Sequence, residues 1–390
     1  MKNKGFTLIE LLAIIVIIAI ITLITMPIVK NVIDQSKEKA AVNSAYGFKD
    51  ALHNYYINST LDDETELEGI YRINDGVIDG PNLSSVSISL KGTKPSAGKV
   101  IYKNGNILIA CLEINGYKVK YRDEQFISEG KGSCDASAAN FATDSWAEIK
   151  FNLEADRNAY PIGSLKTVKM NLTGEEKEYT LRLVNTSHPA ECDTRDVAGN
   201  MTFSQTGCGV VIEFVTIIET RAMNESQNNT GYTATSLRTH LNTDDDSIYN
   251  KLPDDLKAVI IETSPMVSGG VNKALYSYGE KLFPLGIKEV NMSAGTDYST
   301  SYTRVLDFYV DNNNNNARKK YTATNKVETQ KYYSRSARKE YSSQYHSITS
   351  SGGWTYDGSI TDSTFGISAA FRIAEWVKNS FFFMQTNFLS

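Results

Sequence analysis

The sequence is poor in the residue types on which most enzyme and metal sites depend. Its 390 residues include only four cysteines and four histidines, and the histidines are widely scattered. It has no CxxC pair, no His-Glu zinc motif, no phosphate-binding loop and no nucleophile elbow. Because a zinc site needs three or four clustered ligands, we expect no metal and no cofactor. Hydrolytic chemistry has no motif to support it, so we do not expect an enzyme.

A strong charge of either sign is also missing. The formal net charge is -5, from 40 Lys and Arg against 45 Asp and Glu. A mildly acidic chain gives no general reason to bind nucleic acid, so any such function would need a local basic patch. With 41% hydrophobic residues, the chain is long enough for an anchor and roughly two globular domains.

The N-terminus combines a short basic leader with a long apolar run. The leader ends in Gly5, and the apolar run extends from Leu11 to Ile24. A secretory signal peptide carries its small-residue cleavage site after the apolar core, whereas here the small residue precedes it. Glu10 stands at the start of the apolar span, where a carboxylate costs a few kcal/mol unless it finds a partner. The pattern predicts cleavage before the apolar segment.

The hexapeptide Gly5-Phe6-Thr7-Leu8-Ile9-Glu10 resembles the processing motif of type IV prepilins at every position. The resemblance implies that a prepilin peptidase removes residues 1–5 and N-methylates Phe6. It also implies that the Glu10 carboxylate meets the Phe6 ammonium of a neighbouring subunit, where each charge offsets the desolvation of the other. Pro27 stands where many members of the family carry a helix-kinking proline. The alternative is an ordinary single-span anchor that contains a glutamate by chance.

The same resemblance implies partners and a location. The partners would be other pilin subunits, the prepilin peptidase and a membrane assembly platform. The protein would lie in the cytoplasmic membrane before assembly, and in an extracellular pilus at the cell surface afterwards. Loss of Lys2 and Lys4 with the leader would take the net charge from -5 to -7.

A helix is predicted from residue 6 to about residue 57, where Asn58-Ser59-Thr60 breaks the pattern. At 1.5 Å per residue it would be roughly 78 Å long. One apolar stripe at helical spacing runs through Ala41, Ala45, Phe48, Leu52 and Tyr55. We expect this stripe to pack against a globular head.

Residues 58–140 are predicted to form that head, a small antiparallel sheet. Segments 86–90, 99–102 and 116–121 have strand character, and Asn104-Gly105 and Asn115-Gly116 are hairpin turns. Together with Gly92-Thr93-Lys94-Pro95, these hairpins resemble the head of clostridial-type pilins.

The cysteines fall into two neighbouring pairs, Cys111 with Cys134 and Cys192 with Cys208. In an exported chain this spacing suggests two local disulfides, each inside one predicted domain. Four cysteines allow three connectivities, and the sequence alone cannot choose among them.

Residues 141–390 are too long for a pilin loop and are predicted to form a second domain. Segments 166–170, 178–184 and 209–219 have strand character, and residues 236–242 and 253–261 have helix character. Residues 146–376 resemble a bacterial extracellular domain family of unassigned function that is related in fold to C-type lectins and formylglycine-generating enzymes. The resemblance rests on segments 235–238, 282–285, 332–336, 354–359 and 366–373.

Members of that family usually carry Trp-Trp-Leu-Arg-Ser-Pro where this chain has Tyr332 to Ala337, which keeps the aromatic pair and Arg335. The motif position suggests a structural role for Arg335. The chain as a whole is thus predicted to be α+β. A long transmembrane and filament helix would pack on an antiparallel pilin head, and a C-type-lectin-like mixed α+β domain would follow.

Two sets of binding residues are candidates in this second domain. The aromatic set, suited to stacking on a host or surface glycan, is Tyr333, Trp354 and Tyr356. Segment 318–345 has a charge of +6 interleaved with tyrosines, which suits single-stranded nucleic acid or an anionic polymer. The same composition also suits an ordinary solvated surface, which is the favoured interpretation. The basic set is Arg318, Lys319, Lys320, Lys331, Arg338 and Lys339.

These features predict a minor type IV pilin that displays an adhesin-like domain on a surface filament. A domain of this size would crowd a subunit packed at high copy number, which favours a minor subunit. The alternative is a competence or secretion pseudopilin whose basic patch binds DNA. An enzyme displayed on the surface ranks third.

Overall fold

The computed structural model describes residues 8–61, 67–81, 84–103, 105–122, 124–134, 139–155, 157–227, 231–268, 275–277, 279–292, 302–338 and 341–374. The chain divides into two compact units, Met1–Ala138 and Ala139–Ser390. The division falls two residues before the boundary expected from the sequence. Phe141 belongs to the core of the second unit.

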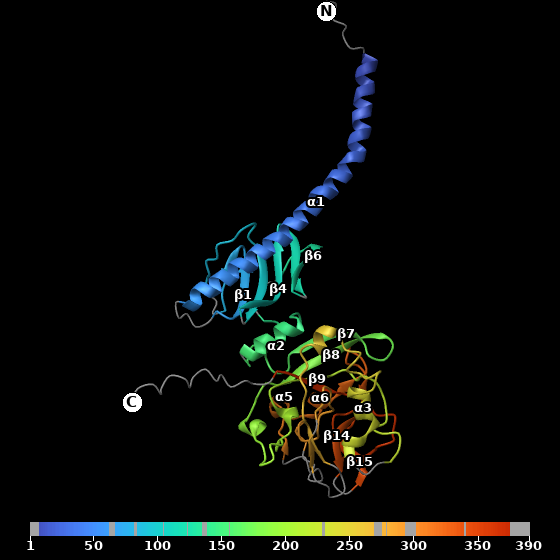
Figure 1. Cartoon of the computed structure of the whole chain (residues 1–390). Helices are drawn as coiled ribbons and strands as arrows, with labels where there is room; N and C mark the ends of the chain where they lie inside the picture. Colours follow the sequence, from blue (N-terminus) through green and yellow to red (C-terminus); the bar gives the residue numbers. More distant parts are fainter. Residues whose placement is uncertain are drawn as a thin grey trace, which may run out of the picture. The chain divides into compact units, whose positions relative to one another are not determined.

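The first unit is organised on one long helix, α1 (Leu8–Leu61), which follows a bent course (Figure 1). The helix continues through Pro27 and also through residues 58–60, so the break predicted there is wrong. Asn, Ser and Thr have only modestly unfavourable helix propensities, and three of them in a row do not end a helix as proline does. The acidic residues that follow, Asp62, Asp63, Glu64 and Glu66, lie outside the described residues.

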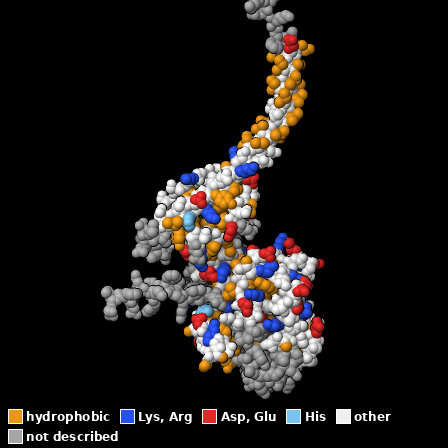
Figure 2. Space-filling view, viewed as in Figure 1, with side chains coloured by type: hydrophobic (Ala, Val, Ile, Leu, Met, Phe, Trp, Pro, Cys, Tyr) orange, Lys and Arg blue, Asp and Glu red, His pale blue; other side chains and the backbone are white. Residues whose placement is uncertain are grey.

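The two halves of α1 have opposite environments. From residue 8 to residue 33 every side chain is exposed, and most are Ile, Leu or Val, as the hydrophobic stretch in Figure 2 shows. Farther along, the predicted stripe is confirmed, because Ala41, Ala45, Phe48 and Leu52 are fully buried. The second half of the helix therefore belongs to a folded core and the first half does not.

The stripe packs against a six-stranded antiparallel sheet in the order β2-β1-β3-β4-β5-β6. Its strands are β1 (Gly69–Asn74), β2 (Val77–Asp79), β3 (Ala97–Lys103), β4 (Asn106–Ile114), β5 (Tyr117–Arg122) and β6 (Gln125–Lys131). The predicted turn at Asn115-Gly116 is confirmed, with φ of 55° and 76°, as a two-residue turn between β4 and β5 requires. The first residue of the other predicted turn, at position 104, lies outside the described residues.

Segment 86–90 is not a strand, contrary to the sequence prediction. Val86, Ile88 and Leu90 instead pack against the core that α1 shares with the sheet. The following residues touch the helix itself, since the Thr93 amide donates to Ser44 Oγ at 3.1 Å. A side chain at Gly47 would clash with the Lys91 carbonyl oxygen. The alternation of apolar and polar residues that indicated a strand belongs here to a loop, which covers the core with its apolar side chains.

The second unit has a mixed α+β architecture built around two sheets. One is four-stranded, in the order β17-β9-β8-β7, and the other is three-stranded, in the order β14-β15-β16. Their strands are β7 (Leu165–Asn171), β8 (Glu176–Asn185), β9 (Val210–Phe214), β14 (Tyr332–Arg338), β15 (Tyr341–Ile348), β16 (Trp354–Ser359) and β17 (Ala370–Ala374). Two small hairpins complete the described strands: β10 (Met266–Ser268) with β11 (Leu275–Ser277), and β12 (Lys320–Tyr321) with β13 (Thr329–Gln330).

Short helices and 3-10 turns fill the connections between these sheets. The helices are α2 (Trp146–Ala155), α3 (Ser236–Asn242), α4 (Asp254–Lys257), α5 (Asp307–Asp311) and α6 (Asn315–Arg318); the 3-10 turns are η1 (Ala190–Asp193), η2 (Gln205–Gly207) and η3 (Gly231–Ala234). The predicted helix 236–242 coincides with α3, and the Thr235 side chain caps it by accepting from the Arg238 amide. The predicted helix 253–261 is reduced to α4, a single turn.

The close approach of loop and helix at Gly47 gives a test of the first unit. Alanine is intrinsically better than glycine in a helix by about 1 kcal/mol, yet its methyl group would push the Lys91 backbone away. We expect Gly47→Ala to lower the free energy of unfolding by about 1–3 kcal/mol, measured by denaturant titration of the full-length protein in detergent. Asn54→Ala on the exposed side of α1 is the control, and it should be neutral or slightly stabilising. Equal stability of the two variants would contradict the close packing.

Candidate functional sites

The first candidate site is the exposed N-terminal half of α1. The span Leu8–Ser59 is long and apolar enough to cross a membrane, and its most apolar window is not buried. Glu10 lies in the first turn of the helix, with its side chain exposed. Gly5 and Phe6, the predicted processing residues, lie outside the described residues. The structure thus presents an unburied apolar rod with one carboxylate near its start.

Tyr333 is not a surface residue, which corrects its prediction as a glycan contact. It lies on β14, is 1% exposed, and stacks on Phe365 with ring centroids 4.4 Å apart. Its hydroxyl donates to the backbone carbonyls of Ser359 and Asp362. Both faces of β14 are buried, because the six residues Tyr332 to Ala337 are all buried. Burial raises the pKa of Tyr333 well above its usual value.

Trp354, by contrast, begins β16 and is 39% exposed. One side of its ring lies against the buried His346 on β15, with centroids 5.5 Å apart. The partly covered indole is therefore held in place and still presents apolar surface to solvent. The Tyr356 side chain lies outside what the structure describes. Of the three predicted stacking residues, Trp354 alone is shown to have an accessible ring.

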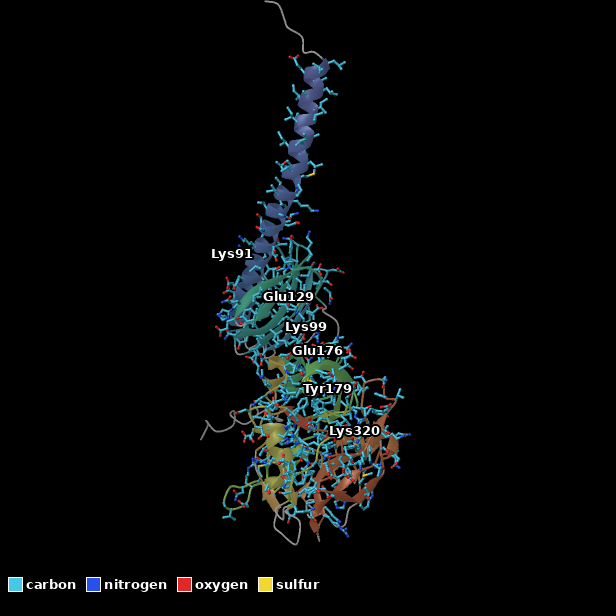
Figure 3. All side chains as sticks on the ribbon, turned by 90° about the vertical axis from the view of Figure 1, so that its right-hand side faces the viewer. Lys91, Lys99, Glu129, Glu176, Tyr179 and Lys320 are labelled. Carbon is cyan, nitrogen blue, oxygen red and sulfur yellow. A yellow bond between two sulfur atoms is a disulfide. The ribbon has the colours of Figure 1, made fainter. Side chains whose placement is uncertain are left out.

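The members of the basic set that the structure describes do not form a common surface, which corrects the second prediction. Arg318 is 4% exposed and Lys320 is 1% exposed, and both side chains point into the second unit. Figure 3 labels Lys320 within this unit. Lys331 pairs with Asp362 at 3.4 Å, and Arg338 donates to Gln344 at 2.7 Å. Lys319 is half-buried, and Lys339 lies outside the described residues.

Lys320 belongs to a buried ionic cluster around Glu213. Its ammonium donates to Glu213 Oε2 at 2.6 Å and to the Phe214 carbonyl at 2.7 Å. Arg182 Nε donates to Glu213 Oε1 at 2.8 Å, and the Tyr309 hydroxyl also donates to this carboxylate. These residues come from β8, β9, α5 and β12, so the cluster ties four elements together.

The cluster contains two cations and one anion, and its pKa shifts follow from that imbalance. Burial would raise the pKa of Glu213, but the charges of Arg182 and Lys320 outweigh burial and lower it. Burial lowers the pKa of Lys320 to about 8, against the opposing attraction of Glu213. The cluster is a structural core. With its carboxylate at 0% exposure, it offers no surface to a ligand.

Arg335 has the structural role that its motif position suggested. Its guanidinium grips the buried Glu289 carboxylate with two bonds, 2.6 Å from Nη1 to Oε2 and 2.5 Å from Nη2 to Oε1. The Gly286 amide donates to this carboxylate at 2.7 Å, the Thr303 hydroxyl donates at 2.9 Å, and the Thr206 hydroxyl donates to it as well. This network connects β14 to segment 286–289 and to Thr303.

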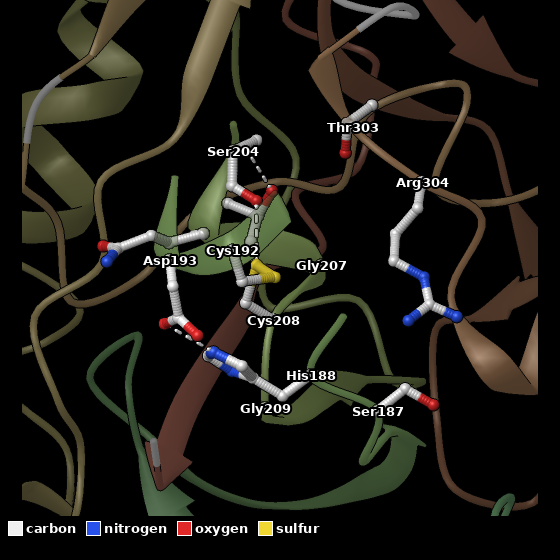
Figure 4. The surroundings of a disulfide bond; sticks show 12 residues. Ser187, His188, Cys192, Asp193, Ser204, Gly207, Cys208, Gly209, Thr303 and Arg304 are labelled. Carbon is white, nitrogen blue, oxygen red and sulfur yellow. Dashed lines mark hydrogen bonds and ion pairs between the residues drawn. A yellow bond between two sulfur atoms is a disulfide. The ribbon is translucent and has the colours of Figure 1, made fainter. Parts of the chain in front are cut away.

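Both disulfides connect neighbouring cysteines, as predicted. Cys111 bonds Cys134 in the first unit, and Cys192 bonds Cys208 in the second, with Cα–Cα distances of 5.6 Å and 5.9 Å. Figure 4 shows the second bridge, where His188 Nε2 lies 3.0 Å from Asp193 Oδ1. Across the part of the chain that the structure describes, no three His, Cys, Asp or Glu side chains are grouped to hold a metal ion.

Two family models match this chain, one at the N-terminus and one within the second unit. Residues 1–26 match a family model described as the prokaryotic N-terminal methylation motif. The N-terminus is of the prepilin type. Residues 209–375 match a second model, described as Domain of unknown function (DUF6273), which covers most of the second unit's sheets and assigns no activity. No curated protein and no solved structure matches the chain.

Together these observations support a type IV pilin-like protein with an apolar assembly helix, two disulfides and an additional α+β unit. A C-type-lectin-like fold for that unit stays a prediction. The residues that sequence reasoning missed are the buried acids Glu213 and Glu289. A signal for the first was present, because Glu213 interrupts the apolar segment 209–219, where an unpaired carboxylate would be costly.

The charge imbalance around Glu213 predicts unequal effects of mutation. Glu213→Gln leaves two buried cations without a counter-charge and should lower the free energy of unfolding by about 3–5 kcal/mol. Lys320→Met leaves a matched Arg182–Glu213 pair, so stability at pH 7 should be unchanged or higher by up to about 2 kcal/mol. Denaturant titration of the full-length protein in detergent measures both.

The same cluster predicts a pH dependence. Because the pKa of Lys320 is about 8 when folded and near 10.5 when unfolded, the unfolded chain binds more protons between these values. Wild-type stability should therefore rise with pH through this window relative to Lys320→Met, by at most about 3 kcal/mol. Parallel stability curves for the two proteins across the window would contradict the lowered pKa of Lys320 in the folded protein.

Proposed function

We propose that this protein is a low-copy type IV pilin-like subunit that displays its second unit as a binding domain on a surface filament. The observation that carries the proposal is the division of α1 into an exposed apolar half and a half packed on a sheet. A helix of this kind leaves its first half for lipid before assembly and for neighbouring helices afterwards. The methylation motif at residues 1–26 supports the same use.

The second unit supports the display part of the proposal. It has extensive hydrophobic clusters of its own and a disulfide, and its size exceeds what packing into a filament requires. Rigid sheets joined by long loops are a common support for binding surfaces. Trp354 gives this unit an exposed aromatic ring on a fixed strand, which suits stacking on a sugar.

The DNA-binding alternative has less support. Of its six proposed cations, Arg318 and Lys320 are buried in the second unit. Lys331 faces a carboxylate, and Arg338 already donates to an amide. Phosphate binding depends on several exposed cations acting together, because each contact releases counterions. The described residues of segment 318–345 do not bring such a group together.

The assembly part of the proposal is tested at Glu10. Glu10→Val should leave the protein in the membrane, because the apolar helix is unchanged, but should exclude it from filaments at least tenfold. The measurement is the ratio of membrane-bound to sheared-filament protein by immunoblot. Ile14→Val, on the same exposed helix half, is the control and should assemble normally. Normal incorporation of Glu10→Val would contradict the role of this carboxylate.

The binding part is tested at Trp354. Trp354→Ala should reduce attachment of filament-bearing cells to a glycan-coated surface by up to about tenfold, since ring stacking is worth about 0.5–1.5 kcal/mol and 1.4 kcal/mol corresponds to tenfold in affinity. The triple variant Lys319→Ala, Lys331→Ala, Arg338→Ala should attach almost normally and with little dependence on salt. Loss of attachment in the triple variant alone, together with loss of DNA binding, would reverse the ranking of the two functions.

A further inference from the structure

A run of five asparagines, residues 312–316, lies against the turn that leads into β16. The run follows α5 and includes the first two residues of α6, and the chain there approaches Gly352 so closely that a side chain at Gly352 would clash with the Asn315 carbonyl oxygen. Gly352 has a φ of 85°, a conformation that favours glycine. Trp354 follows two residues later, at most about 7 Å along the chain. The structure thus brings the backbone of this run, in which Asn313, Asn314, Asn315 and Asn316 are exposed, against a turn two residues before the exposed Trp354.

Arg318 orients two of these asparagines from the interior of the second unit. Its buried guanidinium donates to Asn313 Oδ1 and, at 3.4 Å, to Asn315 Oδ1. The same guanidinium is itself fixed by the carbonyls of Val290 and Asn291, at 2.8 Å and 3.0 Å. The arginine that the sequence suggested for phosphate binding is therefore used inside the protein as an anchor.

This anchoring leaves the donor groups of these exposed residues available. A carboxamide oxygen can accept two hydrogen bonds and its nitrogen can donate two, so accepting from Arg318 uses part of the capacity of Oδ1 and leaves Nδ2 available. Asn314 follows the same pattern, because its Oδ1 accepts the Ala317 amide at 3.0 Å. The exposed side of this segment thereby presents neutral hydrogen-bond donors whose orientation is set before any ligand arrives, which lowers the entropy lost on binding.

We propose that Asn313, Asn315 and Trp354 form a binding site for an uncharged oligosaccharide. Sugar hydroxyls and acetamido carbonyls accept hydrogen bonds from the two Nδ2 groups, and the apolar face of a pyranose ring stacks on the indole. The site has no exposed guanidinium for a phosphate or sulfate, since that of Arg318 is buried. This inference rests on the proposed display function and adds the class of ligand and the residues that select it.

The test uses a change that keeps the anchor and removes the donors. Asn313→Asp with Asn315→Asp preserves both Oδ1 atoms facing Arg318 but replaces each NH₂ by an acceptor. The full-length protein in detergent is assayed against immobilised chitohexaose, an N-acetyllactosamine oligomer and heparin, at low and high salt. We expect wild-type binding to one of the two uncharged probes, little salt dependence, and an affinity loss of tenfold or more in the double variant.

The control is Asn325→Asp, because Asn325 is an exposed asparagine whose Oδ1 likewise accepts a backbone amide, that of Val327. It should bind as wild type does, and thermal unfolding should show that all variants are folded. An uncharged oligosaccharide of this kind could come from a cell wall or from a host surface. Chitohexaose represents the first source and the N-acetyllactosamine oligomer the second, so the preferred probe distinguishes them.

The failures of the two proposals are distinguishable. Binding that is lost in Trp354→Ala but kept in the asparagine double variant would overturn the asparagine site and leave the display function standing. Binding to heparin alone, abolished by salt, would overturn an uncharged ligand. If neither uncharged probe binds and Trp354→Ala cells attach normally, both proposals fall together.

Discussion

The exposed apolar half of α1 is the constraint on which the rest of the molecule depends. Burying a single Leu, Ile or Val side chain is worth about 1.5–3 kcal/mol, and residues 8–33 expose more than a dozen such side chains. Water cannot be the working environment of this segment. Lipid or neighbouring apolar helices must cover it, whereas the second half of the same helix forms a core with its own sheet. The position of the head along the helix follows from where the stripe of small and aromatic residues begins, at Ala41.

The second unit is held together by a different kind of interaction, buried ion pairs between elements far apart in the chain. Glu213 joins Arg182 and Lys320, and Glu289 joins Arg335. Such pairs add little net stability, because desolvation offsets most of the attraction. They do penalise every arrangement in which a charge is buried alone. A unit with short helices, small sheets and long loops has many alternative packings, so this penalty selects the one in which each acid meets its base.

Sequence reasoning succeeded where a pattern is local and failed where a contact is distant. The motif at Gly5 to Glu10, the stripe on α1, the turn at Asn115-Gly116 and the capped helix at Ser236 each depend on residues a few positions apart. Segment 86–90 has the alternation of a strand, but its apolar residues pack as part of a loop. Whether such a segment pairs with a neighbouring strand depends on the tertiary fold, which the local pattern does not contain. The burial of Tyr333 was equally out of reach, because Phe365 lies more than thirty residues away.

The basic segment shows most clearly why composition misleads at such distances. Arginine and lysine next to tyrosines indicate an anionic ligand only if their charges reach solvent, and that depends on acids elsewhere in the chain. Lys320 is buried because Glu213, over a hundred residues earlier, is buried beside it. Arg318 is buried because two backbone carbonyls and two asparagine oxygens receive its donors. The positive charge of Arg318 is thereby used to orient two neutral amides, and in the site that we propose recognition would depend on these amides and not on the charge.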